Sequence, residues 1–401
     1  MNKYLPILIL AIFADVIGNN SVIRVFEVQN HFGTLMLTIS MLILQMFTAP
    51  LQAGFSDYYY RKKSLIFALA CSLISLLLLA FAKSVGMVSV IALWLGLFIN
   101  SCFGNIVPIA WSALADMQKK NLRFFLGLTT SAYAIGYIVL ALMSKAAEKE
   151  ASQSSWILED VVLPLIVIGF SIIFVWKAYY DRKNRSFTSK FQDEKPTFVQ
   201  IARSEINSLL KEIQNPTTCF GLLAYLCWAA SQYSLLLLLL NSQKYTVTVI
   251  VMMIGYLVGV SILGLCRKIQ DEKIIKTAYV ITISFMLMFF IFNLFKGDSN
   301  HWLTISCFFY TLGNAFLTPS IFSLFSKERE IHEQGKGFGL IVSADSAGFL
   351  IGIITVGLFE KFKIDIIYMV LFSFILFLAS IFPYFSYEKT RKDVEKILNN
   401  K

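Results

Sequence analysis

Two acidic residues lie deep inside long apolar stretches of the sequence. Asp15 lies within an apolar run over 4–26, and Asp345 within a run over 336–360. At a rise of about 1.5 Å per residue, both fall near the middle of a membrane-spanning helix. An ionisable group at that depth is costly, and it is a candidate for function. We predict that both carboxyls exchange protons, with Asp15 the first candidate; the alternative is an acid that is hydrogen-bonded for packing alone.

The composition is that of a membrane protein. Of the 401 residues, 57% are hydrophobic and 15% are charged, and the mean hydropathy is +0.68. A hydrocarbon core about 30 Å thick requires roughly 20 apolar residues per helix. Twelve such spans are predicted, over 4–26, 34–53, 64–82, 87–115, 122–144, 159–178, 217–241, 245–265, 274–295, 300–326, 336–360 and 364–386. They show no alternation with a period of two, so we expect an all-α protein rather than a barrel.

The basic residues set the predicted orientation. Most of the 35 Lys and Arg residues fall in segments on one side of the twelve spans, and basic loops stay in the cytoplasm. Both termini are therefore predicted to be cytoplasmic, with the first span kept as a helix. The net charge of +10 is attributed to a membrane face, so no nucleic-acid partner is expected. The six cysteines lie in or beside apolar spans without metal-type spacing, so neither a metal nor a cofactor is predicted.

The chain reads as two similar halves. We predict an N-terminal six-helix bundle over 1–178, a cytoplasmic linker over 179–215, a C-terminal six-helix bundle over 216–388, and a basic cytoplasmic tail over 389–401. The stretch SCFGNIVPIAW at 101–111 aligns with YTLGNAFLTPS at 310–320, which places Asn105 over Asn314. Such a repeat is typical of transporters.

The linker carries its own helix signal. Thr197 and Gln200 form a capping-box pattern, followed by apolar residues at helical spacing. This predicts an amphipathic surface helix, either a latch lying on the membrane or a plain connection.

The segment AGFSDYYYRKKS at 53–64 places charged residues between two apolar spans. It resembles the signature loop of the major facilitator superfamily, in which a glycine precedes an Asp, a second glycine and a basic pair. Ala53 takes the position of the first glycine, Asp57 that of the acid, and Arg61 and Lys62 those of the basic pair. Ala53, Tyr58 and Tyr60 depart from the pattern.

The residue types suit a conformational switch. Asp57 could cap the start of the third span, while Arg61 and Lys62 offer counter-charges that separate when the halves move. A small residue at Ala53 would let another helix approach closely. An ordinary basic inner loop is the alternative.

The resemblance implies two six-helix bundles around a central cavity that opens alternately to each side of the membrane. It also implies that spans one, four, seven and ten line the cavity. Spans two, five, eight and eleven would form the seam between the bundles. The polar candidates for substrate contact are Asn19, Gln45, Asn100, Asn105, Tyr133, Tyr137, Tyr225, Trp228, Gln232, Tyr233 and Asn314. Amides and phenols among aromatic rings suit a neutral or amphipathic organic molecule. Packing between helices would explain any one of them equally well.

The leading hypothesis is a monomeric, proton-coupled secondary transporter of a small organic solute in a bacterial cytoplasmic membrane, with lipids, protons and substrate as partners. Exporters of the superfamily carry Gly-Pro in span five, where this chain has Leu140 and Ala141 after Gly127 and Gly136, which favours symport. An efflux antiporter and a non-transporting receptor remain alternatives. A membrane enzyme would need clustered His, Cys or acidic residues at the inner surface, so no enzyme is predicted.

Overall fold

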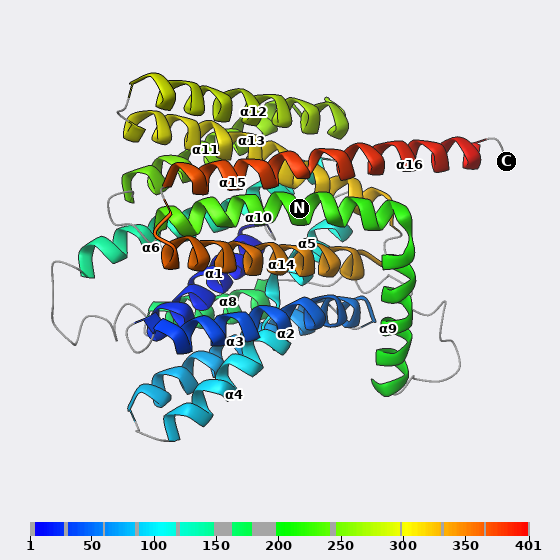
Figure 1. Ribbon diagram of the computed structural model, residues 1–401. Coiled ribbons are helices and arrows are strands. Elements are labelled where there is room, and N and C mark those ends of the chain that lie inside the picture. Colours follow the sequence, from blue (N-terminus) through cyan, green and yellow to red (C-terminus); the bar gives the residue numbers. More distant parts are fainter. Residues whose placement is uncertain are drawn as a thin grey trace. The chain divides into compact units, whose positions relative to one another are not determined.

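The computed structural model of the protein describes residues 5–27, 31–58, 61–84, 88–117, 121–147, 163–178, 198–240, 246–296, 299–329, 333–364 and 366–399. Within these ranges every regular element is a helix, as Figure 1 shows. The helices pack into two compact units. The prediction of an all-α protein is confirmed.

Unit 1 is built from the first five helices, two later ones and the beginning of α14. They are α1 (Leu5–Glu27), α2 (His31–Tyr58), α3 (Arg61–Ser84), α4 (Val88–Phe103), α5 (Ile106–Met117), α8 (Leu163–Ala178), α9 (Phe198–Gln214) and residues 334–343 of α14 (Gln334–Lys361). Unit 2 holds α6 (Leu122–Ala147), α10 (Pro216–Leu240), α11 (Thr246–Leu265), α12 (Asp271–Lys296), α13 (Ser299–Lys327), the rest of α14, α15 (Ile366–Ala379) and α16 (Ile381–Asn399).

Each predicted span coincides with a helix or a pair of helices. Among the described residues, eight helices are long and apolar enough to cross a membrane. Shorter apolar stretches at Leu5–Val16 and Pro164–Lys177 lie in α1 and α8. A helix satisfies its own backbone hydrogen bonds, as a segment surrounded by lipid must. Many large apolar side chains are accordingly exposed on the outside of the helices, for example Phe47 on α2 and Val280 on α12.

Two of the predicted spans are broken, and proline explains both breaks. A proline has no N–H to donate to the carbonyl four residues earlier, and its ring collides with that carbonyl. Pro108 lies four residues after Gly104, where α4 gives way to α5. Pro383 lies four residues after Ala379, where α15 ends. The apolar runs themselves continue through both breaks.

The paired Gly-Asn positions therefore differ in local structure. At Gly104 and Asn105 the helix stops, and the backbone N–H of Ile106 donates to the Gly104 carbonyl over 2.8 Å. Asn314 lies inside the unbroken α13, where a leucine occupies the position four residues after Gly313. The two Gly-Asn pairs therefore match in sequence but differ in backbone conformation.

Glycines on α14 bring neighbouring helices close. In unit 1 a Cβ at Gly335 would collide with the Ala53 carbonyl, and one at Gly339 would collide with Pro50, both on α2. In unit 2 a Cβ at Gly348 would lie 2.6 Å from the Cβ of Ala229 on α10. Spacing of four residues keeps small residues on one helix face, so backbones approach closely there. The expectation of close packing at Ala53 is met by α14.

Each of the two units contains helices from both sides of the predicted linker at 179–215. The α6 helix packs on α11 and α13 in unit 2, where the Tyr256 hydroxyl donates to Thr130 Oγ1 over 2.7 Å. The start of α14 packs on α2 in unit 1. The division into bundles over 1–178 and 216–388 stays a prediction, while the helix expected in the linker is present as α9.

Candidate functional site

A carboxylate held by two phenols lies between α10 and α14 in unit 2. Tyr225 and Tyr233 are eight residues apart on α10, a spacing that puts both rings on one face. The Tyr225 hydroxyl donates to Asp345 Oδ1 over 2.8 Å, and the Tyr233 hydroxyl donates to Oδ2 over 2.7 Å. The close approach of α14 at Gly348 and Gly352 brings the carboxylate within this reach. Each carboxylate oxygen thus has its own phenol donor.

Aromatic rings and one amide surround this carboxylate. Tyr225 packs against Trp228 at 5.4 Å and against Phe322 at 5.3 Å between ring centroids. Trp228 is buried, and its indole N–H donates to Asn314 Oδ1 over 2.9 Å. Tyr233 packs against Phe349 at 4.6 Å. Five residues predicted from the sequence, Tyr225, Trp228, Tyr233, Asn314 and Asp345, therefore form one connected group, here called the Asp345 cluster.

A second group of predicted residues forms in unit 1 around Asp57, at the end of α2. The backbone N–H of Gly335 donates to Asp57 Oδ1 over 3.0 Å, and that of Lys336 donates to Oδ2 over 3.2 Å. These N–H groups belong to the first turn of α14, which has no partners within its own helix. A carboxylate there also meets the positive end of the helix dipole. Asp57 thus caps α14, and its expected cap on the third span stays a prediction.

Arg61 completes this group, here called the Asp57 cluster. Its guanidinium donates to Asp57 Oδ1, to Ser56 Oγ and, over 3.1 Å, to Asp116 Oδ2 at the end of α5. Arg61 and Asp57 are both almost fully buried, so the ion pair is little screened by solvent. Lys62 follows on α3 and is half-buried. The structure therefore brings Ala53, Asp57 and Arg61 together with the start of α14.

The other candidates in unit 1 have mainly structural contacts. The Asn105 side chain donates to the Ser101 carbonyl over 3.1 Å, and its backbone N–H donates to Gln52 Oε1 over 3.1 Å, beside the helix break. Asn100 is buried, and its Oδ1 accepts from Ser72 over 3.1 Å. Gln45 is half-buried on α2.

Asp15 is buried on α1 at 6% exposure. Its proton-coupling role stays a prediction, and so does the substrate role of Asn19, whose side chain lies outside the described residues. In unit 2, Tyr133 on α6 and Gln232 on α10 are half-buried. Tyr137 lies on α6, and its side chain is also outside the described part.

Unit 2 also contains a charged group that was not predicted from the sequence. Asp271 begins α12, is buried, and accepts from Arg123 on α6 and, over 2.5 Å, from Lys327 on α13. Arg123 also donates to the carbonyls of Ile269 and Cys266. Asp271 lies in the first turn of α12, where an acidic residue is common, so its type and position alone did not mark it as a buried partner of Arg123. The pattern of an acidic residue directly before an apolar helix could have indicated this residue.

No cation site is visible in the described ranges. Among these residues, the His, Cys, Asp and Glu side chains form no group of three or more that could hold a metal ion. The charged clusters are instead ion pairs between helices.

Sequence comparison identifies a family over most of the chain. A family profile described as Major Facilitator Superfamily matches residues 5–353. A comparison with curated protein sequences finds no match.

Similar solved structures cover nearly the whole chain. The E. coli fucose:proton symporter FucP aligns with a TM-score of 0.71 at 15% identity, over 95% of this chain and 98% of its own. The human organic anion transporter MFSD10 aligns at 0.67 and 12% identity, over 96% and 99%. The proton:xylose symporter XylE, bound to 6-bromo-6-deoxy-D-glucose, aligns at 0.67 and 12% identity, over 97% and 94%. At these identities the likeness establishes the fold.

Proposed function

Since the chain belongs to the major facilitator superfamily, we propose that it is a secondary active transporter that moves a small organic solute by proton-coupled symport. The family fold, with twelve membrane-spanning helices in two six-helix bundles, fits the helices found here. Two of the similar structures are described as proton symporters, which supports this choice of coupling ion. The observation that carries the proposal is the Asp345 carboxylate on an apolar membrane helix, held by two phenols.

Protonation would change that hydrogen-bond arrangement. An ionised carboxylate only accepts hydrogen bonds, whereas a protonated one also donates through its O–H. Both phenols now donate to Asp345, one to each oxygen. On protonation one oxygen gains an O–H, so it becomes a weaker acceptor for the phenol facing it and can itself donate to that phenol. The contact between α10 and α14 therefore depends on the proton, which is the coupling that symport requires.

The same cluster favours a substrate without net negative charge. The α10 helix has no Lys or Arg, and α14 has none between Lys336 and Lys361. An anion near Asp345 would meet a like charge and no basic partner from these two helices. Trp228, Tyr233 and Asn314, which are buried or half-buried in this structure, would offer ring faces and an amide when the site opens, and these suit a neutral or amphipathic molecule. The proposed setting is a bacterial cytoplasmic membrane, with both termini in the cytoplasm and a monomer as the working unit.

Transport by purified protein in liposomes tests this function. Candidate neutral and amphipathic solutes are offered with and without an imposed pH gradient, and uptake against a concentration gradient is measured. Wild type should accumulate its substrate only with the gradient. Asp345→Asn keeps the size of the side chain but cannot titrate, so accumulation should be lost while exchange of substrate across the membrane persists.

Matched variants separate coupling from folding. Tyr225→Phe and Tyr233→Phe remove one phenol donor each and should reduce coupling while leaving exchange. Accumulation by Asp345→Asn at the wild-type level would refute this role for Asp345. Loss in Asp15→Asn alone would transfer the role to α1.

A further inference from the structure

The α9 helix presents three different surfaces around its circumference. It crosses the end of α2 and runs nearly perpendicular to it (Figure 1). Residues three and four apart share a helix face, so the burial of successive side chains can be read as stripes. One stripe contacts protein, one is exposed and apolar, and one is exposed and polar.

The first stripe fixes α9 to the start of α14. The Lys336 ammonium donates to Ser208 Oγ over 2.8 Å, and Arg329 forms an ion pair with Glu212 over 2.9 Å. Leu209 lies beside these residues on the helix and is buried at 7% exposure. The backbone N–H of the same Lys336 donates to Asp57. The helix is thus held in a defined rotation next to the Asp57 cluster.

The second stripe is apolar and exposed. Ile206, Leu210 and Ile213 are 46%, 54% and 48% exposed. The third stripe, formed by Arg203, Asn207 and Lys211, is polar and exposed. With 3.6 residues per turn, the centres of the three stripes are roughly a third of a turn apart. A helix lying between water and lipid against a protein wall needs this arrangement.

We propose that α9 lies in the headgroup layer of the cytoplasmic leaflet, with Ile206, Leu210 and Ile213 inserted toward the acyl chains. The ends of the membrane helices that α9 crosses place it at the level of that layer. The basic residues Arg203 and Lys211 on its polar side, and the exposed Lys63 at the start of α3, suit anionic phospholipid.

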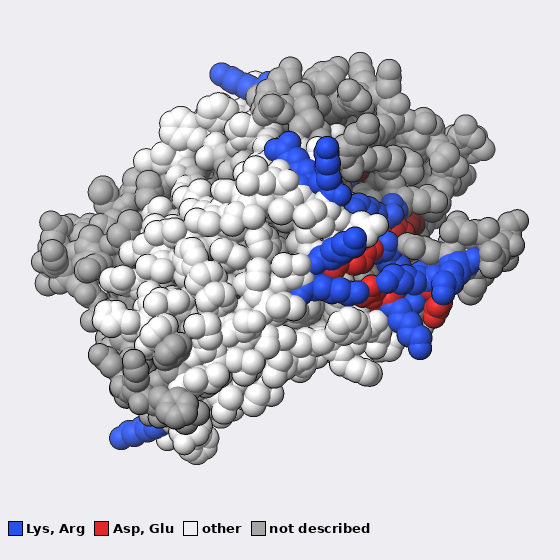
Figure 2. Space-filling view, turned by 90° about the horizontal axis from the view of Figure 1, so that it is seen from above, with Lys and Arg blue, Asp and Glu red and all other residues white. Residues whose placement is uncertain are grey.

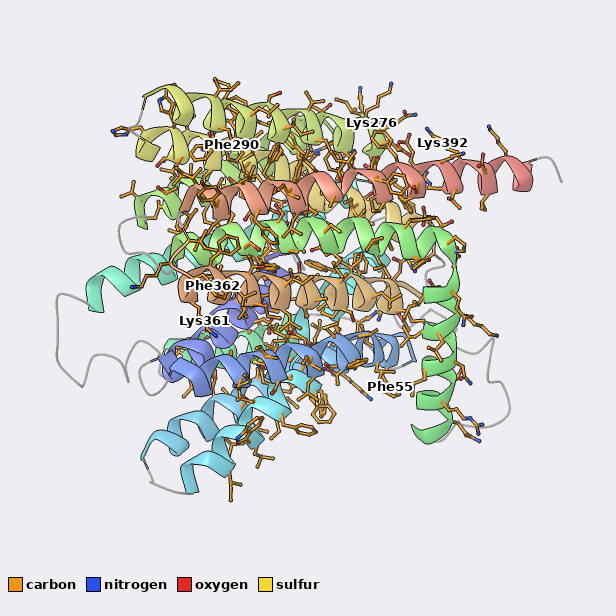
Figure 3. The ribbon with its side chains drawn as sticks, viewed as in Figure 1. Phe55, Lys276, Phe290, Lys361, Phe362 and Lys392 are labelled. Carbon is orange, nitrogen blue, oxygen red and sulfur yellow. The ribbon has the colours of Figure 1, made fainter. Side chains whose placement is uncertain are left out.

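The charges of the described surface are gathered and do not spread over it. Figure 2, the face seen from above Figure 1 where α12 lies, shows Lys and Arg gathered with Asp and Glu in one region beside a wide uncharged surface. In Figure 3, Phe55 marks the last turns of α2 near α9, and nitrogen-tipped side chains of α9 point away from the helices of unit 1. The α9 helix packs on α2, whose exposed apolar side chains include Ile43 and Phe47.

Membrane attachment would also act on the Asp57 cluster. Lys336 bonds α9 through its side chain and Asp57 through its backbone. A helix anchored in lipid therefore holds the first turn of α14 through the Lys336 side chain, while Asp57 holds the same residue through its backbone. The composition of the inner leaflet would bias the state in which that turn is held.

Collision measurements on spin labels test the proposal in the full-length protein. Single cysteines replace Ile206, Leu210, Ile213, Arg203, Asn207 or Lys211 in turn, in a chain without its native cysteines. Each labelled protein is reconstituted in phosphatidylethanolamine and phosphatidylglycerol. Labels at the three apolar positions should collide more with oxygen, which concentrates in lipid, than with a water-soluble nickel chelate. Labels at the three polar positions should show the reverse.

Two outcomes would overturn the proposal. If nickel reaches all six positions, the helix lies in water. If the apolar positions are shielded from both reagents, protein covers the stripe, either a second copy or another chain. As a further arm, Leu210→Glu should make labels at the other apolar positions accessible to nickel, whereas the matched Asn207→Glu should leave them in lipid. Equal accessibility in the two variants would also reject membrane insertion.

Discussion

Replacing Asp57 by Asn should release the first turn of α14. The carboxylate accepts two backbone N–H groups of that turn and the guanidinium of Arg61. The amide keeps the shape but loses the charge, and its NH2 group now faces donors. Losing a charge-assisted hydrogen bond costs about 1.5–3 kcal/mol. Losing a negative charge at a helix N-terminus costs about 0.3–2 kcal/mol.

Together these effects amount to roughly 2–5 kcal/mol, or about thirtyfold to several thousandfold in the equilibrium between the held and released turn. Gln334, the first residue of α14, is buried at 5% exposure. A single cysteine at that position, in a chain without its native cysteines, should therefore react slowly with a water-soluble maleimide while Asp57 is in place. With Asp57→Asn the labelling rate should rise toward that of an exposed cysteine.

Asp116→Asn is the matched control. It removes the other carboxylate that bonds Arg61 while leaving the two bonds from α14 to Asp57 in place. Its effect on labelling at position 334 should be smaller. The reasoning fails if Asp57→Asn leaves labelling at the wild-type rate, or if the two variants raise it equally.

Three further outcomes are expected. Gly348→Val should lower the free energy of unfolding by about 1–3 kcal/mol, because a Cβ there meets Ala229. The control Gly357→Val has open space around it and should not lower it by this amount. Thermal unfolding in detergent measures both variants. Asp271→Asn should destabilise the protein by about 3–5 kcal/mol, since Arg123 is left as a buried charge without its carboxylate, and an unchanged melting temperature would contradict this. Asp15→Asn, assayed for uptake beside Asp345→Asn, should reduce accumulation if both acids exchange protons.

The sequence predicted the helices well because length and apolarity alone define a membrane span. It did not predict the breaks at Gly104 and Ser380, since apolarity continues through them. The prolines that cause these breaks are visible in the sequence, but Pro50 and Pro319 lie inside unbroken helices. A proline signal therefore needs the local context, such as the glycine at position 104, before it marks a break.

The members of the Asp345 cluster could be named from the sequence, but their pairing could not. The Asp345 and Tyr225 side chains are 120 positions apart, and helical periodicity says nothing about contacts at that separation. Asp57 shows the same limit, since its partner turn is more than 270 positions away. Residue type and depth in the membrane indicate which groups are costly to bury, and tertiary packing decides what satisfies them.

One unbroken helix carries both the turn capped by Asp57 and the carboxylate held by the two phenols. Gly335 and Asp345 are ten residues apart on α14, which is about 15 Å along the axis. No proline interrupts this stretch, so it can transmit a shift or a rotation as a stiff rod. A displacement produced by protonation at one point would then reach the capped end undiminished. On the proposed proton role of Asp345, α14 would act as a lever, with the titrating carboxylate partway along it and the turn capped by Asp57 at its end.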